Sequence, residues 1–183
     1  GISTSIWDRK ADGTIRSENE VLPPFVAERN EPYYFVLAFP NDSLDEKRLL
    51  FEMARYNFSR YMVRSFEMSF ERLAQVTLLE VKTFLNFDEV FLYRKRLYAS
   101  KETAKILQGI NSFIISKTNL DLLLQYYSFE DYNKFYKDMF YDFEDPFMHL
   151  HYSVEGVVDY KALLYIPKKC PEAYFSKYFE RGL

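Results

Sequence analysis

Two histidines near the end of the chain are the residues best placed to do chemistry. His149 and His151 are separated by one residue, so on a strand both rings would project from the same face, as in a two-histidine metal site. Glu144 and Asp145 lie nearby in the sequence. However, no third ligand follows at a dedicated spacing, and paired strand histidines are more often partly exposed than metal-bound. We therefore predict no metal site.

The single cysteine is the other candidate for reactivity. Cys170 lies between Lys169 and Pro171, and a neighbouring lysine can lower the pKa of an exposed thiol. A cysteine nucleophile also needs a base and an orienting partner, and the two histidines lie well upstream. Because the glycines are few and not spaced as in a phosphate-binding loop, no such loop is present. We predict no enzymatic activity and no cofactor; a hydrolase using Cys170 and a histidine is the weakest alternative.

The composition describes an ordinary globular chain that is unusually aromatic. The net charge is -3, with 28% charged and 19% aromatic residues, so attraction to nucleic acid or anionic lipid is not expected. The basic run at residues 93–96 follows Asp88 and Glu89, a pattern that more often forms a solvated helix face than an anion site. No apolar run is long enough to cross a membrane, so we predict no direct membrane insertion by this segment.

An extended arm or linker is predicted over residues 1–30, which lack a sustained hydrophobic period. Only a few apolar positions there, Trp7 among them, are expected to dock against the rest. A buried strand follows at residues 33–39, and a helix at residues 44–60 is expected to begin with a capping box formed by Ser43 and Glu46.

The remaining pattern alternates strands and helices. Strands are predicted at residues 63–67 and 74–84, with a turn at 69–72, and a helix from Asn86 with Val90, Tyr93, Leu97 and Tyr98 facing inward. A short helical segment at 101–109, a strand at 112–116 and two helices beginning near Thr118 and at Ser128 come next. The last helix carries an aromatic stripe that favours core packing over a cofactor site. A β-hairpin around the Glu155-Gly156 turn is predicted at residues 151–171.

This order predicts an α+β fold of the ferredoxin-like, split βαβ type. Such a fold has a four-stranded antiparallel sheet with helices on one face, here followed by C-terminal helices and the hairpin. The predicted divisions are an arm at 1–30, the ferredoxin-like domain at 31–140 and a hairpin extension at 141–183. From strand phase, Tyr33, Phe35, Glu80 and Lys82 are predicted to bind a protein partner from the uncovered sheet face.

Several stretches between residues 31 and 140 resemble a domain of bacterial envelope proteins. EPYYFVLAFPND at 31–42, ARYNFSRY at 54–61, VTLLEVKTFLNFDEVFLYRKRL at 76–97 and the run at 110–140 carry the resemblance. The family is the C-terminal domain of Bacteroidota tetratricopeptide-repeat lipoproteins of gliding motility and type IX secretion, of the SprE/PorW kind. The resemblance implies a non-enzymatic assembly module that binds envelope proteins and is periplasmic or associated with the outer membrane. No repeat of about 34 residues is visible in the chain itself.

A second resemblance covers the tail. EDYNKFYKDMFYDFEDPF at 130–147 and HYSVEGVVDYKALLYIPKKCP at 151–171, with YFSKYFERGL at the end, resemble the middle domain of the ninety-kilodalton heat-shock chaperones, whose bacterial form is HtpG. It implies the alternative function, a fragment of an ATP-dependent chaperone that binds clients or co-chaperones in the cytoplasm, without the family's ATP site. The overlap of the two resemblances at 130–140 is compatible with a natural fusion, an engineered chimera or chance similarity.

Overall fold

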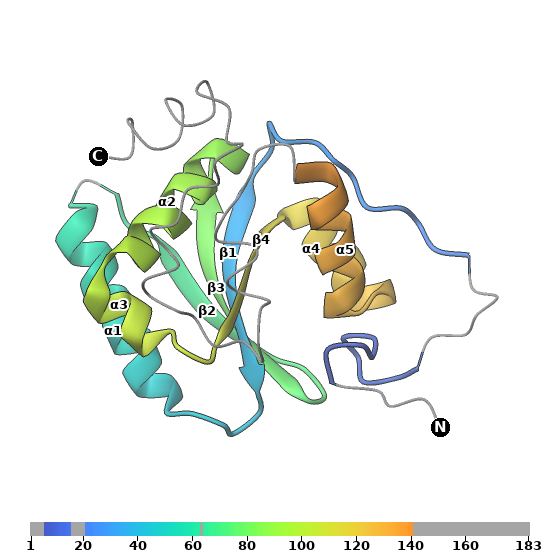
Figure 1. The fold of residues 1–183 in the computed structure, drawn as a ribbon, viewed down its shortest axis with the longest axis horizontal. Coiled ribbons are helices and arrows are strands. Elements are labelled where there is room, and N and C mark those ends of the chain that lie inside the picture. The colour runs from blue at the N-terminus through green and yellow to red at the C-terminus, as the bar shows by residue number, and fades with distance from the viewer. Residues whose placement is uncertain (1–5, 16–20, 63, 141–183) are drawn as a thin grey trace, which may run out of the picture.

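The computed structural model describes residues 6–15, 21–62 and 64–140 of the chain. Strands and helices alternate through this part, and two helices complete it (Figure 1). In chain order the elements are β1 Tyr33–Pro40, α1 Glu46–Arg60, β2 Glu67–Arg72, β3 Val76–Phe84, α2 Phe87–Ala99, α3 Lys101–Ile106, β4 Asn111–Ser116, α4 Lys117–Tyr126 and α5 Phe129–Phe140.

The four strands form one antiparallel sheet in the order β2-β3-β1-β4. This is the strand order of a ferredoxin-like α+β fold, so the predicted fold class is confirmed. Figure 1 shows α1, α2 and α3 together on one side of the sheet, whereas α4 and α5 lie beside β4. The hairpin predicted at residues 151–171 lies outside the described residues.

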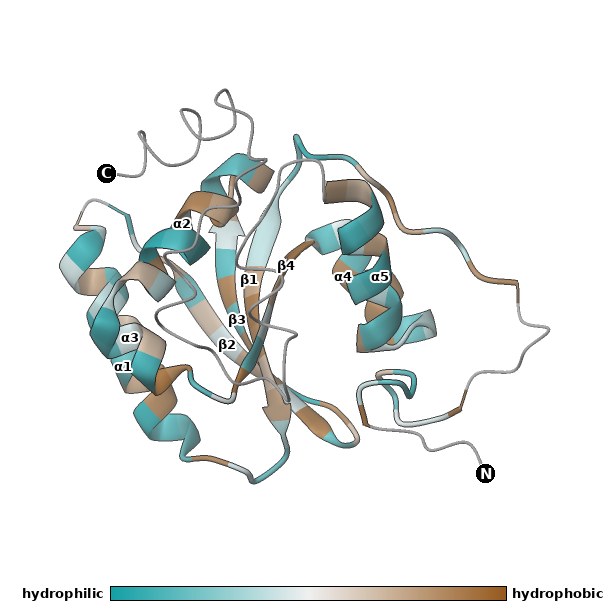
Figure 2. Ribbon diagram, in the orientation of Figure 1, coloured by the Kyte–Doolittle hydropathy of each residue, from teal (hydrophilic) through white to brown (hydrophobic). Residues whose placement is uncertain are grey.

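The central strand β1 is buried on both faces of the sheet. Its side chains from Tyr33 to Phe39 are at most 9% exposed, and the run of aromatic and aliphatic residues has no polar side. Within the sheet, β3 and β4 pair with its two edges. Figure 2 shows hydrophobic residues along the central strands and hydrophilic residues over much of the helices. The core therefore lies on the sheet.

The helices begin at side chains that cap their free N–H groups. Asn86 accepts from the Glu89 N–H at 3.0 Å, which confirms the predicted start of α2. In α1 the cap is Asp45, which accepts from the Arg48 N–H at 3.1 Å. The prediction of Ser43 as the cap is wrong, since the Ser43 hydroxyl instead donates to the Pro40 carbonyl at 2.6 Å.

The β2-β3 hairpin is shifted relative to the prediction. The expected turn at residues 69–72 is part of β2, and the chain reverses at 73–75, where the Leu73 N–H bonds the Val76 carbonyl at 2.8 Å. Met68 and Phe70 alternate with Glu67, Ser69 and Glu71, which is a period of two on an edge strand. In the sequence, the polar residues of that alternation resemble those of a turn, which is why a turn is predicted there.

The described parts of the arm contain no helix or named strand but are tied to the body. The Asn119 side chain accepts from the Val26 N–H at 2.8 Å and donates to the Val26 carbonyl at 2.7 Å. The Trp7 ring packs edge-on against Phe129, with centroids 5.6 Å apart. Trp7 is therefore a packing residue, as predicted, while the division of the chain into three regions stays a prediction.

Candidate functional site

Two of the four predicted partner-binding residues lie in the core. Tyr33 and Phe35 are 0% exposed and point toward the helices, where their rings pack edge-on against Phe87 and Tyr93. The Tyr33 hydroxyl donates to the Glu28 carbonyl at 2.6 Å, and burial raises its pKa well above the ordinary value. The prediction that these residues lie on an uncovered face is wrong, because the strand phase was assigned to the opposite side.

Glu80 and Lys82 lie on the other face of the sheet. The Lys82 Nζ is 3.7 Å from a Glu80 carboxylate oxygen and 5.6 Å from the centre of the Tyr34 ring. Glu80 is only 4% exposed; burial, followed by the hydrogen bond and charge of Glu71, raises its pKa to about 7. The structure thus separates the four predicted residues into two pairs, and partner binding by any of them stays a prediction.

The basic run at 93–96 is only in part the solvated face that the sequence predicted, because Arg96 is exposed but Arg94 and Lys95 are buried. Arg94 is 0% exposed, its guanidinium lies 5.7 Å from the Phe91 ring and 5.8 Å from the Tyr136 ring, and Nη2 donates to the Tyr136 hydroxyl at 3.4 Å. Lys95 is also buried, which lowers its pKa to about 8, with a smaller contribution from the neighbouring positive charge of Arg96. The sequence contains a signal for the burial of Arg94, because this residue lies four positions after Val90 on the inward face of α2.

Helix α5 closes the β4 edge of the sheet. Ser128 and Asp131 cap its start reciprocally, with bonds of 2.9 and 3.1 Å, as the sequence predicted. The Tyr132 hydroxyl then donates to the Ile114 carbonyl of β4 at 2.6 Å, and the Phe113 ring packs against the Tyr132 ring at 6.0 Å. An edge strand covered in this way is protected from pairing with another chain.

The predicted aromatic stripe of α5 is largely core. Tyr132, Tyr136 and Phe140 are nearly fully buried, whereas Met139 is 50% exposed. The Phe140 ring stacks on Phe87 of α2, with centroids 4.8 Å apart. Helix α5 therefore connects the β4 edge to α2 through aromatic contacts, and Met139 is the large apolar side chain that it presents outward.

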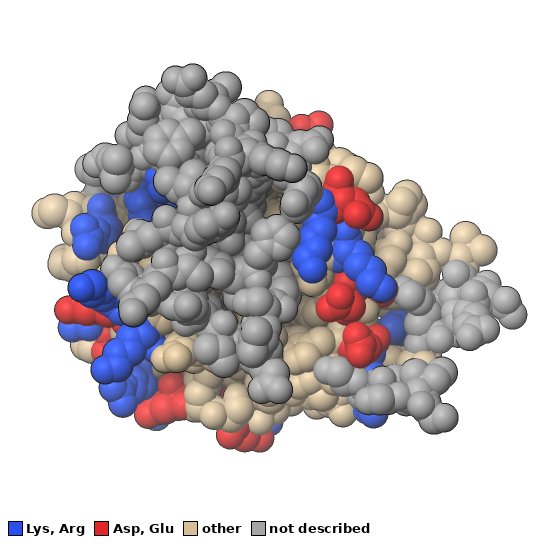
Figure 3. Space-filling model, in the orientation of Figure 1, with Lys and Arg blue, Asp and Glu red and all other residues tan. Residues whose placement is uncertain are grey.

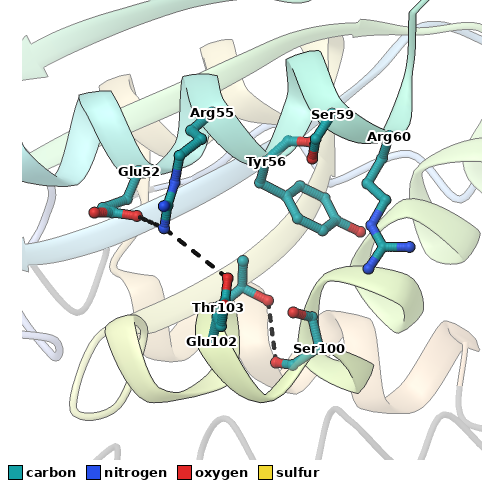
Figure 4. A pocket seen from close by; sticks show the side chains of 8 residues that line it. All are labelled: Glu52, Arg55, Tyr56, Ser59, Arg60, Ser100, Glu102 and Thr103. Atoms are coloured by element: carbon teal, nitrogen blue, oxygen red, sulfur yellow. Dashed lines mark hydrogen bonds and ion pairs between the residues drawn. The ribbon is translucent and has the colours of Figure 1, made fainter.

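A polar hollow of about 220 Å³ lies between α1 and α3 (Figure 4). Arg55 in its wall bonds Glu52 at 2.6 Å and lies 4.0 Å from Glu102. The Ser59 hydroxyl already donates to the Tyr56 carbonyl at 2.9 Å, and the hollow contains no histidine or cysteine to activate it. Its lining suits binding of a charged group better than nucleophilic catalysis. The lining residues are Glu52, Arg55, Tyr56, Ser59, Arg60, Ser100, Glu102 and Thr103.

The residues considered for metal binding and thiol chemistry lie outside the described residues. These are His149, His151 and Cys170, with Glu144 and Asp145 beside the histidines. Within residues 6–15, 21–62 and 64–140, no group of three His, Cys, Asp or Glu side chains is arranged to hold a metal ion. No helix in the same part of the chain is both long and apolar enough to span a membrane.

Comparison with known proteins finds similarity at the C-terminal end of the chain. The family model described as Hsp90 protein matches residues 125–182, which begin at the end of α4 and include α5. The chaperone protein HtpG of Fusobacterium nucleatum is 52% identical over 54 residues, which are 30% of this chain and 9% of that protein. HtpG of Bacillus subtilis is 48% identical over 54 residues, again 30% and 9%.

A longer match is found with HtpG of Clostridium acetobutylicum, 42% identical over 86 residues, which are 45% of this chain and 13% of that protein. The chain thus spans only about a tenth of the length of the curated relatives it matches. No solved structure matches the chain.

These findings confirm the second resemblance and not the first. The similarity is to the Hsp90 and HtpG chaperones, so the prediction of a secretion or gliding-motility protein is wrong. The envelope partners and periplasmic location that accompanied it have no support. The error arose because the first resemblance rested on spaced apolar and aromatic positions, which the ferredoxin-like core requires for its own packing.

Proposed function

We propose that this chain is a protein-binding segment of an Hsp90-type chaperone, contacting clients or co-chaperones in the cytoplasm. The observation that carries the proposal is the Hsp90 match at residues 125–182, with HtpG identities near one half over 54 residues. A dense match over a short segment supports a shared contact surface there. The chain spans only about a tenth of the length of these relatives, so the match does not extend to the activity of the complete proteins. That activity is only proposed for this chain.

The described part of the matched segment supports a binding role. Helix α5 is fixed by its cap and by the bond from Tyr132 to β4, so its outward side is presented on a rigid element. Met139 on that side is 50% exposed, and methionine adapts to varied apolar surfaces. A non-native client exposes such surfaces.

We also propose that the chain does not hydrolyse ATP by itself. The sequence has no glycine-rich phosphate loop. The chain is thus expected to contribute to binding within the chaperone and to leave catalysis to other parts of it.

Site-specific photo-crosslinking to a thermally unfolding client tests the proposal. A photoreactive residue replaces Met139 in the full chain, and the matched control carries it at Val21, which is 95% exposed but lies outside the matched segment. We expect crosslinks from position 139 that depend on unfolding of the client, slower client aggregation and no ATP turnover above buffer. Equal crosslinking from both positions, or unchanged aggregation, would contradict the proposal.

A further inference from the structure

The outward side of α1 carries an apolar seam that the core does not use. Phe51 is 63% exposed and Phe58 is 80% exposed, and Met62, just beyond the helix, is 87% exposed. The helix meets the core through its opposite side, with Leu49, Met53 and Tyr56. Scattered exposed apolar residues are common, but here two large ones lie seven residues apart on one side of the helix and a third follows directly after it.

The spacing of the seam is that of a helix-packing surface. Phe51, Arg55 and Phe58 succeed each other by four and three residues, the repeat by which one helix packs along another, and Met62 follows just beyond the C-cap Tyr61. Phe51 and Phe58 are about 10 Å apart along the axis, at about 1.5 Å per residue. A partner helix with apolar residues seven apart would meet both rings.

Basic side chains flank the seam on α1. Lys47, Arg48 and Arg55 are exposed on that side of the helix, and Figure 3 shows basic side chains, with acidic ones among them, where α1 and α3 lie. Arg55 forms ion pairs with Glu52 and Glu102, whereas Lys47 and Arg48 form none within the described residues. Lys47 and Arg48 therefore favour a partner with acidic side chains.

The hollow described above lies next to the seam. Figure 4 shows that Arg55 and Arg60 reach from α1 along this hollow toward the α3 side, and the Arg60 guanidinium is 6.0 Å from the Tyr56 ring. Arg55 belongs to both the seam and the wall of the hollow. A carboxylate on a helix lying along the seam would thus find the Arg55 guanidinium at its border.

We propose that the outward side of α1 binds an acidic amphipathic helix of a partner protein. The apolar side of that helix covers Phe51, Phe58 and Met62, and its Asp or Glu residues meet Lys47 and Arg48. A second copy of this chain fits less well, because an antiparallel α1 pair would place Arg55 against Arg55. The surface is independent of the proposed chaperone function, since residues 51–62 lie outside the matched segment.

Fluorescence anisotropy with labelled helical peptides tests this inference on the full chain. The probe is a peptide of about 15 residues, the length of α1, with Leu at positions spaced by three and four and Glu at the flanks. A second peptide replaces each Glu by Lys, and a third has the sequence of the first scrambled. The chain variants are Phe51→Ser/Phe58→Ser, Lys47→Glu/Arg48→Glu and, as the matched control, Val21→Ser at another exposed apolar site.

We expect the Glu peptide alone to bind the wild-type chain. The phenylalanine variant weakens binding by about tenfold or more, the charge-reversed variant shifts preference to the Lys peptide, and Val21→Ser changes neither. Thermal melts of all variants should coincide, because the changed side chains are exposed. Binding of the scrambled peptide equal to that of the Glu peptide, self-association that Phe51→Ser/Phe58→Ser abolishes, or binding to anionic vesicles alone would overturn the inference.

Discussion

Glu80 should make the folded state less stable as the pH rises. Its carboxyl is 4% exposed and lies in the sheet opposite Val36 and Ser69, with Glu71 and Lys82 as its charged neighbours. Burial raises its pKa from the ordinary 4.5 to about 7, so the folded state holds the proton more tightly than the unfolded state. The stabilisation is complete below pH 4.5 and is lost as the pH rises through about 7.

The size of this effect follows from the two pKa values. At about 1.4 kcal/mol per pKa unit, the difference between 4.5 and about 7 sets an upper limit of about 3.5 kcal/mol. Lys82, 3.7 Å away and half-buried, partly compensates the negative charge. We therefore expect the Glu80 contribution to the free energy of unfolding to fall by about 1 to 2 kcal/mol between about pH 5 and pH 8.

Urea unfolding of the wild type and of Glu80→Gln at both pH values measures the effect. The amide cannot ionise, so the stability lost between pH 5 and pH 8 should be smaller in Glu80→Gln than in the wild type by the expected 1 to 2 kcal/mol, as estimated above from the pKa shift. The control is Glu102→Gln, because Glu102 is exposed and should leave the pH dependence unchanged. If Glu80→Gln and the wild type lose the same stability, the buried carboxyl does not take up a proton and the reasoning is refuted.

Three further substitutions test the contacts that hold the fold together. Tyr132→Phe removes the donor to the Ile114 carbonyl, and urea unfolding should show a loss of about 1 to 1.5 kcal/mol; an unchanged midpoint would mean that water satisfies that carbonyl. Asn119→Ala removes both bonds to Val26, so limited proteolysis should cut residues 21–30 sooner, whereas an unaltered cleavage pattern would show that other contacts hold the arm. Ser128→Ala removes half of a capping box and should lower stability by about 1 kcal/mol, which Ser128→Thr should largely restore in the same measurement.

The sequence determined the fold class because the signals for it are local. The apolar run of β1, the Asn86 cap and the Ser128 cap each depend on residues within a few positions of one another. Once their order was established, the connection rules of split βαβ folds left few alternatives. The confirmed strand order β2-β3-β1-β4 follows from that order.

The candidate sites were less predictable because they depend on distant parts of the chain. The outward seam of α1 is a partial exception, since its four-three spacing is visible in the sequence, but that spacing is equally compatible with core packing. Only the exposure of Phe51 and Phe58 shows which side of the helix the core leaves free.

Tertiary structure alone decided the surroundings of Arg94 and Glu80. Arg94 reaches Tyr136 across 42 positions of sequence. Glu80 lies between β1 and β2, opposite Val36 and Ser69. A charged residue in a sequence suggests a solvated surface, because leaving water is costly unless a partner is in place. Which partners are in place depends on how helices and strands pack: the spacing to Val90 places Arg94 on the inward face of α2, but nothing local in the sequence identifies Tyr136 as its partner.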